Sequence, residues 1–513
     1  MSIPVPHLIV AALILPALLG ALTLLLLRHR LGASRLVSLG SCLALVGIAA
    51  SLTFHASGGA VESYALGNWR APFGIVLVLD RLSAMMLLLT AVLALAVMSY
   101  AVVTGADRKG WHFHPLFQFQ LLGLNGAFLT GDLFNLFVFF EVLLIASYGL
   151  LLHGQGATRL KAGVQYVVIN LVGSTLFLVG VGLLYGVTGT LNMADMAVRV
   201  AAASPGDQGL IAAAALVLTV VFALKAALAP LHFWLPGAYA ATTATVAALF
   251  AIMTKVGAYA LIRTGTLIFG VDAGALAWLT ADWMLPAAII TTVIGFVGLF
   301  AARTLREMAA WSVVGSMGVL LSAVSVFRVE AMGPALYYAA HSTLAGAALF
   351  LVVDMIAKRR AEHGDALTLA PRFCQSELLS GLFFLSAIGI VGLPPLSGFI
   401  GKLLILDGVR AAPEAAWIWA TILITTLIGV LAFARAGSRL FWKSASVDGT
   451  IPVRALRGRW GGVGVAASLL GLLAALTVLG GPVTAYTGAT AAQLFDPQQY
   501  IDAVLGPTAG GRR

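Results

Sequence analysis

Apolar stretches of about twenty residues follow one another from one end of this sequence to the other, with short polar segments between them. An α-helix of that length crosses the ~30 Å hydrocarbon core of a lipid bilayer. Only 10% of the 513 residues are charged and 60% are hydrophobic, whereas a soluble protein carries about a quarter charged residues. The sequence therefore predicts an all-α integral membrane protein that lies in a lipid bilayer.

The apolar stretches divide into about fourteen predicted transmembrane helices of ordinary length. Two of them, near residues 115–130 and 132–152, are joined by almost nothing and are expected to form an antiparallel hairpin. All fourteen are expected near residues 7–27, 35–54, 82–103, 115–130, 132–152, 163–186, 210–229, 238–263, 282–302, 308–327, 334–356, 377–406, 416–436 and 463–480.

Lysine and arginine residues are divided unevenly between the two sides of these predicted helices. Of the 30, nineteen fall in loops on one side, eight (among them Arg81, Arg199 and Arg263) are assigned to the other, and three lie inside helices. Cytoplasmic loops of membrane proteins carry the excess of positive charge, so the first side is expected to be cytoplasmic and both termini external. Because the net charge of +10 arises in short loops, no nucleic-acid partner is expected.

Two predicted helices, the seventh and the twelfth, are interrupted by proline. The seventh reaches Lys225 and is broken at Pro230, and the twelfth is broken at Pro394 and Pro395 before Lys402. Proline lacks a backbone donor and clashes with the preceding turn. Inside a membrane such breaks persist only where they face protein or a water-filled cavity. Interrupted helices five spans apart indicate two inverted five-helix repeats with an ion path between them.

This symmetry divides the chain into four parts. Helices 1 to 3 are expected within residues 1–110, the first five-helix repeat within 111–265 and the second within 278–440. Residues 441–513 are expected to hold the fourteenth helix and a tail.

Four charged side chains inside predicted helices are the main functional candidates. Glu141 lies near the middle of the apolar run 128–151, and Lys225, Lys255 and Lys402 lie in three other helices. Because a charge at the centre of a bilayer costs roughly 2.5–3.5 kcal/mol, such residues usually have a partner or a task. Burial disfavours the charged form of a lysine and a nearby carboxylate favours it. A pair of Glu141 and Lys225 would therefore load and release a proton.

Two histidines extend this group. His232 follows Pro230, where freed carbonyls and water would accept its proton, and His341 lies in the eleventh predicted helix. Each of these residues also has a structural alternative: a lysine that snorkels to the headgroups, an ion pair that only packs helices together, or a satisfied core histidine. The two broken helices favour the relay.

Sites for metals and cofactors are not expected. The two cysteines, Cys42 and Cys374, have no metal-ligand spacing, and the sequence contains no nucleotide-binding loop, haem signature or iron–sulfur cysteine run. No catalytic residue is expected either.

Three stretches resemble a known family of membrane proteins. TGDLFNLFVFFEVLL around Glu141, KAALAPLHFWLPGAYAATTATVAALFAIMTKVGAYALIR, and GLPPLSGFIGK are similar to the antiporter-like subunits of NADH–quinone oxidoreductase and of Mrp (Mnh, Pha) cation/proton antiporters. The first stretch and the lysine after the broken twelfth helix look most like the D-type member of the Mrp antiporter subunits. The resemblance covers nearly the whole chain.

The resemblance implies a subunit of fourteen helices with two inverted repeats. The family's relay glutamate matches Glu141, and its basic residues match Lys225, Lys255 and Lys402. The histidine of the eleventh helix matches His341. Many relatives carry a lysine a few residues after this histidine, where this chain has Gly346, so a relay here must pass through His341, hydroxyl groups and water.

These observations predict the proton-translocating subunit of a multisubunit Na⁺(K⁺)/H⁺ antiporter in a bacterial inner membrane, not an enzyme. Its partners would be other subunits of the complex, protons and monovalent cations. The relay would contain Glu141, Lys225, His232, Lys255, His341 and Lys402. The alternatives are a proton-pumping subunit of a redox complex (NADH–quinone oxidoreductase or a membrane hydrogenase), a self-sufficient transporter and a structural scaffold. The sequence leaves open the choice of cation, the stoichiometry, the cation route, the order of the relay and the composition of the complex.

Overall fold

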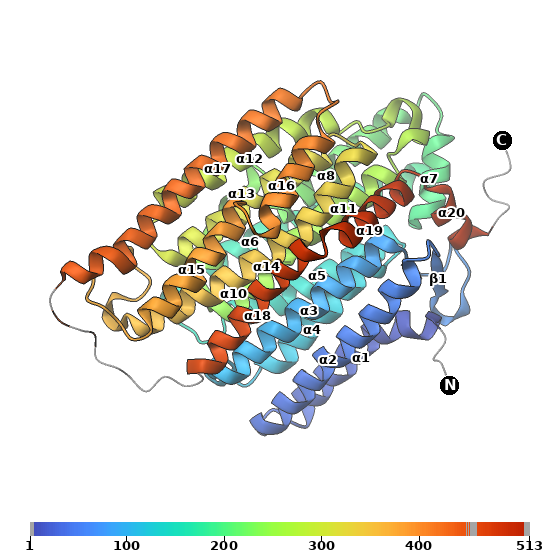
Figure 1. Ribbon diagram of the computed structural model, residues 1–513. Coiled ribbons are helices and arrows are strands. Elements are labelled where there is room, and N and C mark those ends of the chain that lie inside the picture. The colour runs from blue at the N-terminus through green and yellow to red at the C-terminus, as the bar shows by residue number, and fades with distance from the viewer. Residues whose placement is uncertain (1–4, 448, 450, 452–458, 507–513) are drawn as a thin grey trace.

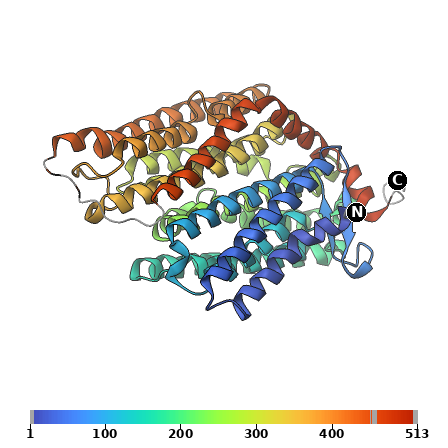
Figure 2. The same cartoon turned by 60° about the horizontal axis from the view of Figure 1, so that its bottom comes forward.

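A computed structural model describes residues 5–447, 449, 451 and 459–506 of the chain. Its helices pack side by side in one bundle, with residues 5–56 on one flank and residues 415–442 on the opposite flank (Figures 1 and 2). The C-terminal residues 459–505 pack against residues 81–104 and 62–65 of the N-terminal part. Four of the basic residues counted above, Arg454, Arg457, Arg512 and Arg513, lie outside the described residues.

Twelve helical stretches of the described residues are long and apolar enough to cross a membrane. This confirms the expected all-helical membrane protein, whereas the number fourteen remains a prediction because α4 and α15 are shorter. The twelve stretches contain α1 (Val5–Leu25), α2 (Leu31–Ala56), α3 (Arg81–Thr104), α5 (Leu133–Leu151), α6 (Ala157–Thr188), α8 (Gln208–Lys225), α10 (Ala244–Phe250) with α11 (Met253–Leu267), α12 (Ala281–Ala301), α13 (Leu305–Val324), α14 (Val329–Arg359), α17 (Ala415–Gly437) and α18 (Arg459–Val478).

Shorter elements complete the bundle. The remaining α-helices are α4 (Phe113–Leu129), α7 (Met193–Ala201), α9 (Trp234–Ala241), α15 (Ser376–Val391), α16 (Ser397–Gly408), α19 (Gly480–Leu494) and α20 (Gln498–Leu505). The other elements are two strands, β1 (Glu62–Ala65) and β2 (Val76–Leu79), and the short helical turns η1 (Leu66–Asn68), η2 (Ala106–Lys109), η3 (Leu231–Phe233), η4 (Val271–Leu276), η5 (Ala361–His363), η6 (Ser438–Trp442) and η7 (Lys443–Ser446).

Helix α14 forms the centre of the bundle. It packs against α10, α13, α15, α16, α18 and α19, and almost all of its side chains are buried. Because a helix buried on all sides can place a polar side chain far from lipid, α14 is suited to carry an ionisable group through the core.

Both helices that were expected to break are broken. Helix α8 ends at Lys225 and the chain resumes helical structure only at η3 and α9. Helix α15 ends at Val391, and α16 begins at Ser397 after a turn in which Gly392 has φ 80°. A third interruption, between α10 and α11 at residues 251–252, was not expected.

One end of the bundle is closed by a β-hairpin and by α20. Strands β1 and β2 pair antiparallel, and Thr130 forms an isolated bridge to Leu77 of β2. Helix α20 is held to β1 because the hydroxyl of Ser63 donates to the Ala503 carbonyl, 2.7 Å away. Helix α1 begins at this same end (Figure 1).

Arg263 was assigned to an external loop, and this is wrong. It lies within α11, only 4% exposed, and its Nη1 is 2.6 Å from Oδ2 of the buried Asp80. The expected helix ended at residue 263, whereas α11 continues to Leu267 and carries the arginine inside the protein.

Close packing between α8 and α11 predicts the effect of a substitution at Gly257. A Cβ atom there would lie 2.5 Å from the backbone nitrogen of Ala226 and 2.9 Å from the carbonyl carbon of Lys225. We expect Gly257→Val to cost at least about 1–3 kcal/mol, as overpacking usually does, and to lower the melting temperature of the purified complex.

The matched control is Gly182→Val, because no atom lies within 4 Å of a Cβ placed at Gly182 in α6. An equal melting temperature for the two variants would contradict the packing described for Gly257.

Candidate functional site

Glu141 and Lys225 are connected by polar side chains of α6, not by a direct ion pair. The hydroxyl of Ser174 donates to Oε1 of Glu141 on α5. One turn earlier on α6, Oδ1 of Asn170 accepts a hydrogen bond of 2.9 Å from Nζ of Lys225. Residues four apart lie on one helix face, so Asn170 and Ser174 bridge the carboxylate and the ammonium group. The two charges remain within electrostatic range of each other.

A small cavity of about 20 Å³ lies beside the Lys225 ammonium. Asn170 and Lys225 line one side of it, and Met253 and Val256 of α11 line another. A space of this size holds about one water molecule. The cavity therefore extends from Lys225 toward the helix that carries Lys255.

The break after Lys225 leaves backbone groups that other side chains satisfy. The indole Nε1 of Trp234 donates to the Leu224 carbonyl at 3.0 Å. The backbone nitrogen of Ala229 donates to the hydroxyl of Thr291 on α12 at 2.7 Å. Because unsatisfied backbone groups are costly at membrane depth, these contacts stabilise the interrupted helix.

The three lysines are buried: the exposed fractions of Lys225, Lys255 and Lys402 are 8%, 1% and 4%. Such exposure excludes snorkelling to a headgroup, because the ammonium groups do not reach the surface. Lys255 lies in the first turn of α11, and its ammonium makes no hydrogen bond to another of the described residues. A buried charge without a protein partner requires water.

His341 lies at the break between α15 and α16. Its Nε2 is 3.1 Å from the Gly389 carbonyl and its Nδ1 is 2.9 Å from the hydroxyl of Ser397. A carbonyl only accepts, so we assign the proton to Nε2, and Nδ1 accepts from Ser397. His341 thereby contacts both halves of the broken helix and lies within electrostatic range of both Lys255 and Lys402.

Lys402 folds back from α16 across the same break. Its Nζ donates to the carbonyl of Val391, the last residue of α15, at 2.7 Å and to the hydroxyl of Thr426 on α17 at 2.8 Å. The ammonium also lies 5.1 Å from the ring centroid of Phe296. The Val391 carbonyl at the end of α15 thus accepts a hydrogen bond from the Lys402 ammonium.

His232 is the sequence-predicted residue that the structure connects least. It lies in η3, half-buried, with its ring 5.9 Å from that of Trp311. Its Nδ1 is buried and has no hydrogen-bond partner among the described residues. No hydrogen bond of the described chain joins it to Lys225 or Lys255.

The chain matches a known protein family over more than half of its length. The family named NADH:quinone oxidoreductase/Mrp antiporter, TM, matches residues 130–429. The chain belongs to this family. The matched region contains all six predicted relay residues.

Relatives of similar length place the chain among the D-type subunits of these antiporters. It is 41% identical to the D-type subunit of a probable K⁺/H⁺ antiporter from Rhizobium meliloti (strain 1021) over 99% of both chains. It is 36% identical to the D-type subunit of the Na⁺/H⁺ antiporter from Bacillus subtilis (strain 168) over 96% of this chain and 98% of the relative. A chain of the Mrp complex from Dietzia sp. DQ12-45-1b superposes with a TM-score of 0.85 at 28% identity, covering 98% of this chain and 99% of that one.

Sequence reasoning found the ionisable groups of this antiporter subunit but missed their neutral partners. Asn170, Ser174, Ser397 and Thr426 hold the relay candidates in place. One signal was available, because Asn170 and Ser174 are spaced four residues apart in an otherwise apolar helix. The hydroxyl groups at 397 and 426 had no such signal, since serine and threonine are common inside membrane helices.

Among the described residues, no group of three or more histidine, cysteine, aspartate or glutamate side chains has the arrangement of a metal site.

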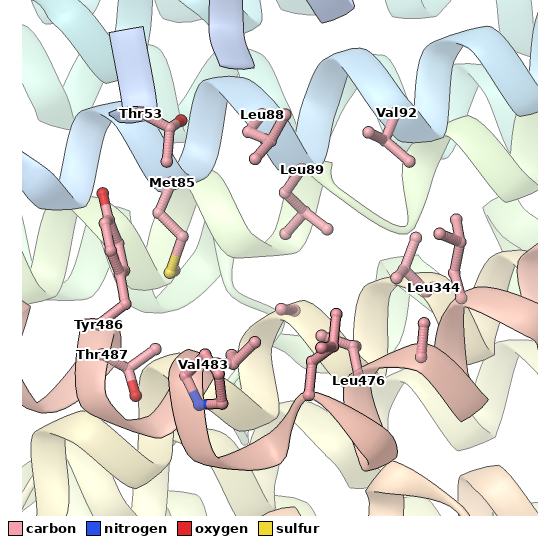
Figure 3. A pocket seen from close by; sticks show the side chains of 15 residues that line it. Thr53, Met85, Leu88, Leu89, Val92, Leu344, Leu476, Val483, Tyr486 and Thr487 are labelled. Atoms are coloured by element: carbon pink, nitrogen blue, oxygen red, sulfur yellow. The ribbon is translucent and has the colours of Figure 1, made fainter. Parts of the chain in front are cut away.

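A large apolar cavity lies apart from the ionisable residues. This groove of about 440 Å³ runs between α3, α14, α18 and α19 and is lined almost entirely by apolar side chains (Figure 3). Among its lining residues are Leu88 and Leu89 of α3, Leu344 of α14 and Val483 of α19. Because an apolar groove does not solvate an ion, it is excluded as the ion path.

The setting of His341 predicts different effects for two neighbouring glycines. A Cβ atom on Gly398 would lie 2.2 Å from the Gly389 carbonyl oxygen and 2.8 Å from Nε2 of His341. A Cβ atom on Gly389 would have its nearest neighbour at an ordinary 3.4 Å. We expect Gly398→Ala to displace His341 and to reduce proton transport by the assembled complex, while Gly389→Ala retains it. Equal transport in both variants, measured per assembled complex in membrane vesicles, would refute this geometry.

Proposed function

We propose that this chain carries protons within a multisubunit Na⁺/H⁺ or K⁺/H⁺ antiporter of a bacterial cell membrane. Relatives of almost full length are named as D-type antiporter subunits, with either Na⁺ or K⁺ as the cation. The observation that carries the proposal is the set of buried ionisable groups Lys225, Lys255, His341 and Lys402, which lie in or beside interrupted helices, with Glu141 linked to Lys225 through α6. Other subunits of the complex are its partners, and the cation route is not assigned to this chain.

The first part of the relay contains Glu141 and Lys225. Lys225 is held by the neutral oxygen of Asn170, so it can lose its proton without leaving a bare carboxylate next to it. A change of protonation at Glu141 alters the hydrogen bond from Ser174 and, through α6, the position of Asn170. Glu141 thereby controls the proton affinity of Lys225.

The central part of the relay contains Lys255 and His341, with Lys402 as its end. Water in the cavity beside Lys225 would pass the proton toward α11 and Lys255. His341 accepts a proton on Nδ1 only when the Ser397 hydroxyl rotates away, so Ser397 controls the step between Lys255 and Lys402. His232, which has a free nitrogen on the first broken segment, would join the relay through water.

The proposed topology has fourteen transmembrane helices, with α8–α9 and α15–α16 as the broken seventh and twelfth. The parts are residues 1–110, an inverted repeat in 111–265, its counterpart in 278–440, and 441–513. The support for this division is that the two breaks lie five transmembrane helices apart, at the same position in each proposed repeat.

The proposed orientation puts both termini outside and the basic loops in the cytoplasm. At the end of the bundle opposite the β-hairpin, burial lowers the pKa of the Lys109 ammonium, and the nearby Arg159 and Lys358 lower it further. Such a concentration of positive charge is typical of a cytoplasmic face.

The relay is tested by substitutions in the whole complex. We expect Glu141→Gln and Lys225→Ala to abolish cation-dependent proton exchange in everted vesicles, measured with a pH-sensitive dye in an antiporter-deficient strain. Asn170→Leu removes a hydrogen bond to a charged group, worth about 1.5–3 kcal/mol, and should slow exchange roughly tenfold or more.

Ser174→Ala and Thr175→Val form the matched pair for this test. Ser174 contacts Glu141, whereas the neighbouring hydroxyl of Thr175 only bonds the Leu171 carbonyl on an exposed face. We expect slower exchange for the first and unchanged exchange for the second, at equal assembly. Full exchange in the Glu141 and Lys225 variants would reduce both residues to a structural role.

The second candidate function is a proton pump driven by a redox complex. The matching family includes NADH:quinone oxidoreductase subunits, and the same buried groups would serve there. Purification of the chain with its natural partners separates the two functions, because iron–sulfur proteins would accompany only the redox complex.

A further inference from the structure

One buried arginine outside the proposed relay lies on the same helix face as Lys255. Lys255, Tyr259 and Arg263 are spaced four residues apart along α11. The rise of a helix separates the first from the last by about 12 Å. Arg263 therefore stands between Lys255 and the end of the bundle that carries the β-hairpin and α20.

Arg263 is buried and contacts three side chains: Asp80, Tyr259 and Tyr500. We term these four residues the Arg263 cluster. Nη1 of Arg263 lies 2.6 Å from Oδ2 of Asp80, and its Nε donates to the Tyr259 hydroxyl at 3.3 Å. The rings of Tyr259 and Tyr500 lie 5.4 and 5.1 Å from the guanidinium carbon.

Arg263 carries the permanent positive charge of this cluster. Arginine does not release its proton in proteins, so Arg263 stays cationic and cannot take part in a relay. The Asp80 carboxylate lies beyond it, at the start of α3, where Oδ1 also accepts from the Ser83 backbone at 2.8 Å. Burial raises the pKa of the Asp80 carboxyl, but Arg263 and Ser83 more than offset this and hold it below its usual value. Of the two members of the pair, Arg263 is the one that shares a helix with Lys255, about two turns away.

We propose that Arg263 is a fixed-charge barrier that closes this end of α11 to protons. A proton on Lys255 that moved along α11 would approach a second cation in a medium of low dielectric constant, which opposes the movement. The proton is thereby directed toward His341. This inference rests on the proposed function of Lys255 as a proton carrier.

The barrier is tested by the cation-independent proton conductance of the purified complex in liposomes. Removal of one unit charge at about 12 Å changes the rate by about tenfold at an effective dielectric constant of about 20. We therefore expect Arg263→Gln to raise proton leak about tenfold. Since that variant leaves Asp80 buried and unpaired, the double variant Arg263→Gln/Asp80→Asn, with two neutral hydrogen-bonding side chains, is tested beside it. It removes one charge of each sign, so it should leak less than the single variant.

Two further variants separate the barrier from a structural ion pair. Asp80→Asn alone leaves the positive charge in place and should not leak. Arg263→Lys also keeps the positive charge and should not leak either. A merely structural pair predicts the same loss of stability for Asp80→Asn and Arg263→Gln and no leak in either. Tight liposomes containing an assembled Arg263→Gln complex would overturn the barrier.

Adding Lys255→Ala to the leaking variant distinguishes this inference from the proposed function. Loss of the leak supports a barrier that acts on the Lys255 path. A leak that persists overturns the barrier for Lys255, while the exchange measurements on Glu141 and Lys225 still decide the proposed function independently.

A second, independent observation concerns the apolar groove between α3, α14, α18 and α19. It extends along α3 from Met85 to Val92, about 10 Å of helix, with Thr53 and Tyr486 at one end and Leu344 toward the other (Figure 3). Its apolar lining suits a hydrocarbon chain.

The side chain of Arg81 lies next to Tyr486 at one end of this groove. The guanidinium carbon of Arg81 lies 5.8 Å from the Tyr486 ring centroid, and the Tyr486 hydroxyl donates to the Arg81 carbonyl at 2.8 Å. The Nη2 atom of Arg81 donates to the Ser57 carbonyl at 2.7 Å. No carboxylate of the described residues pairs with Arg81, which lies at the first residue of α3, where a membrane helix meets the headgroups.

We infer that the groove binds an acyl chain of an anionic phospholipid, with the headgroup phosphate at Arg81. Arginine matches phosphate in charge and geometry, and a cation near an anionic membrane surface contributes to such binding. The apolar wall next to an unpaired cation is the chemistry of a lipid, not of an ion or a polar metabolite.

Lipid binding is tested by mass spectrometry of the complex purified from membranes and re-lipidated with phosphatidylglycerol or phosphatidylcholine of the same chains. We expect Arg81→Gln and the groove-filling Leu89→Trp each to reduce retained phosphatidylglycerol about tenfold, whereas Arg70→Gln, an exposed arginine, does not. Equal retention of both lipids, unchanged retention in the variants, or crosslinking of Val92→Cys to a partner protein of the complex would overturn the lipid site.

Discussion

The structure depends on the cost of burying positive charge at membrane depth. A lysine in hydrocarbon needs oxygen acceptors, and a regular helix offers none because its carbonyls are already bonded. The breaks in the bundle release such acceptors. Lys402 uses the carbonyl of Val391 where α15 ends, and His341 donates to the carbonyl of Gly389, two residues earlier. The interrupted helix α15–α16 therefore supplies the acceptors that keep Lys402 and His341 inside this membrane protein.

The same constraint explains the close approach of helices around these groups. Gly257 brings α11 against the end of α8, and Gly398 brings α16 against His341. A larger side chain at either position would separate the ionisable group from its partner. Small residues here do more than allow packing, because a proton passes only between groups that lie within hydrogen-bond reach of each other or of one shared water.

The sequence predicted the fold and the charged residues well because both signals are strong in a membrane protein. Hydropathy marks the helices, proline marked the breaks before α9 and α16, and each charge stood out against an apolar background. The interruption at residues 251–252 carries no proline and was missed. Neutral partners such as Asn170 could not be recognised from composition alone, since their role depends on which helices meet. Arg263 was misplaced because a residue near a predicted helix end looks like a loop residue.

Four cations of the bundle show two kinds of partner. Lys225 and Lys402 are bound by neutral oxygens. Arg35 and Arg263, in contrast, are bound by buried carboxylates: Nε of Arg35 lies 2.6 Å from Asp107. An ammonium on neutral oxygens can give up its proton at the cost of one hydrogen bond, whereas neutralising one member of a buried ion pair leaves its partner uncompensated, which costs about 3–5 kcal/mol. Under the proposed function, the lysines beside the broken helices are the cations that exchange protons, whereas the two arginines keep their charge.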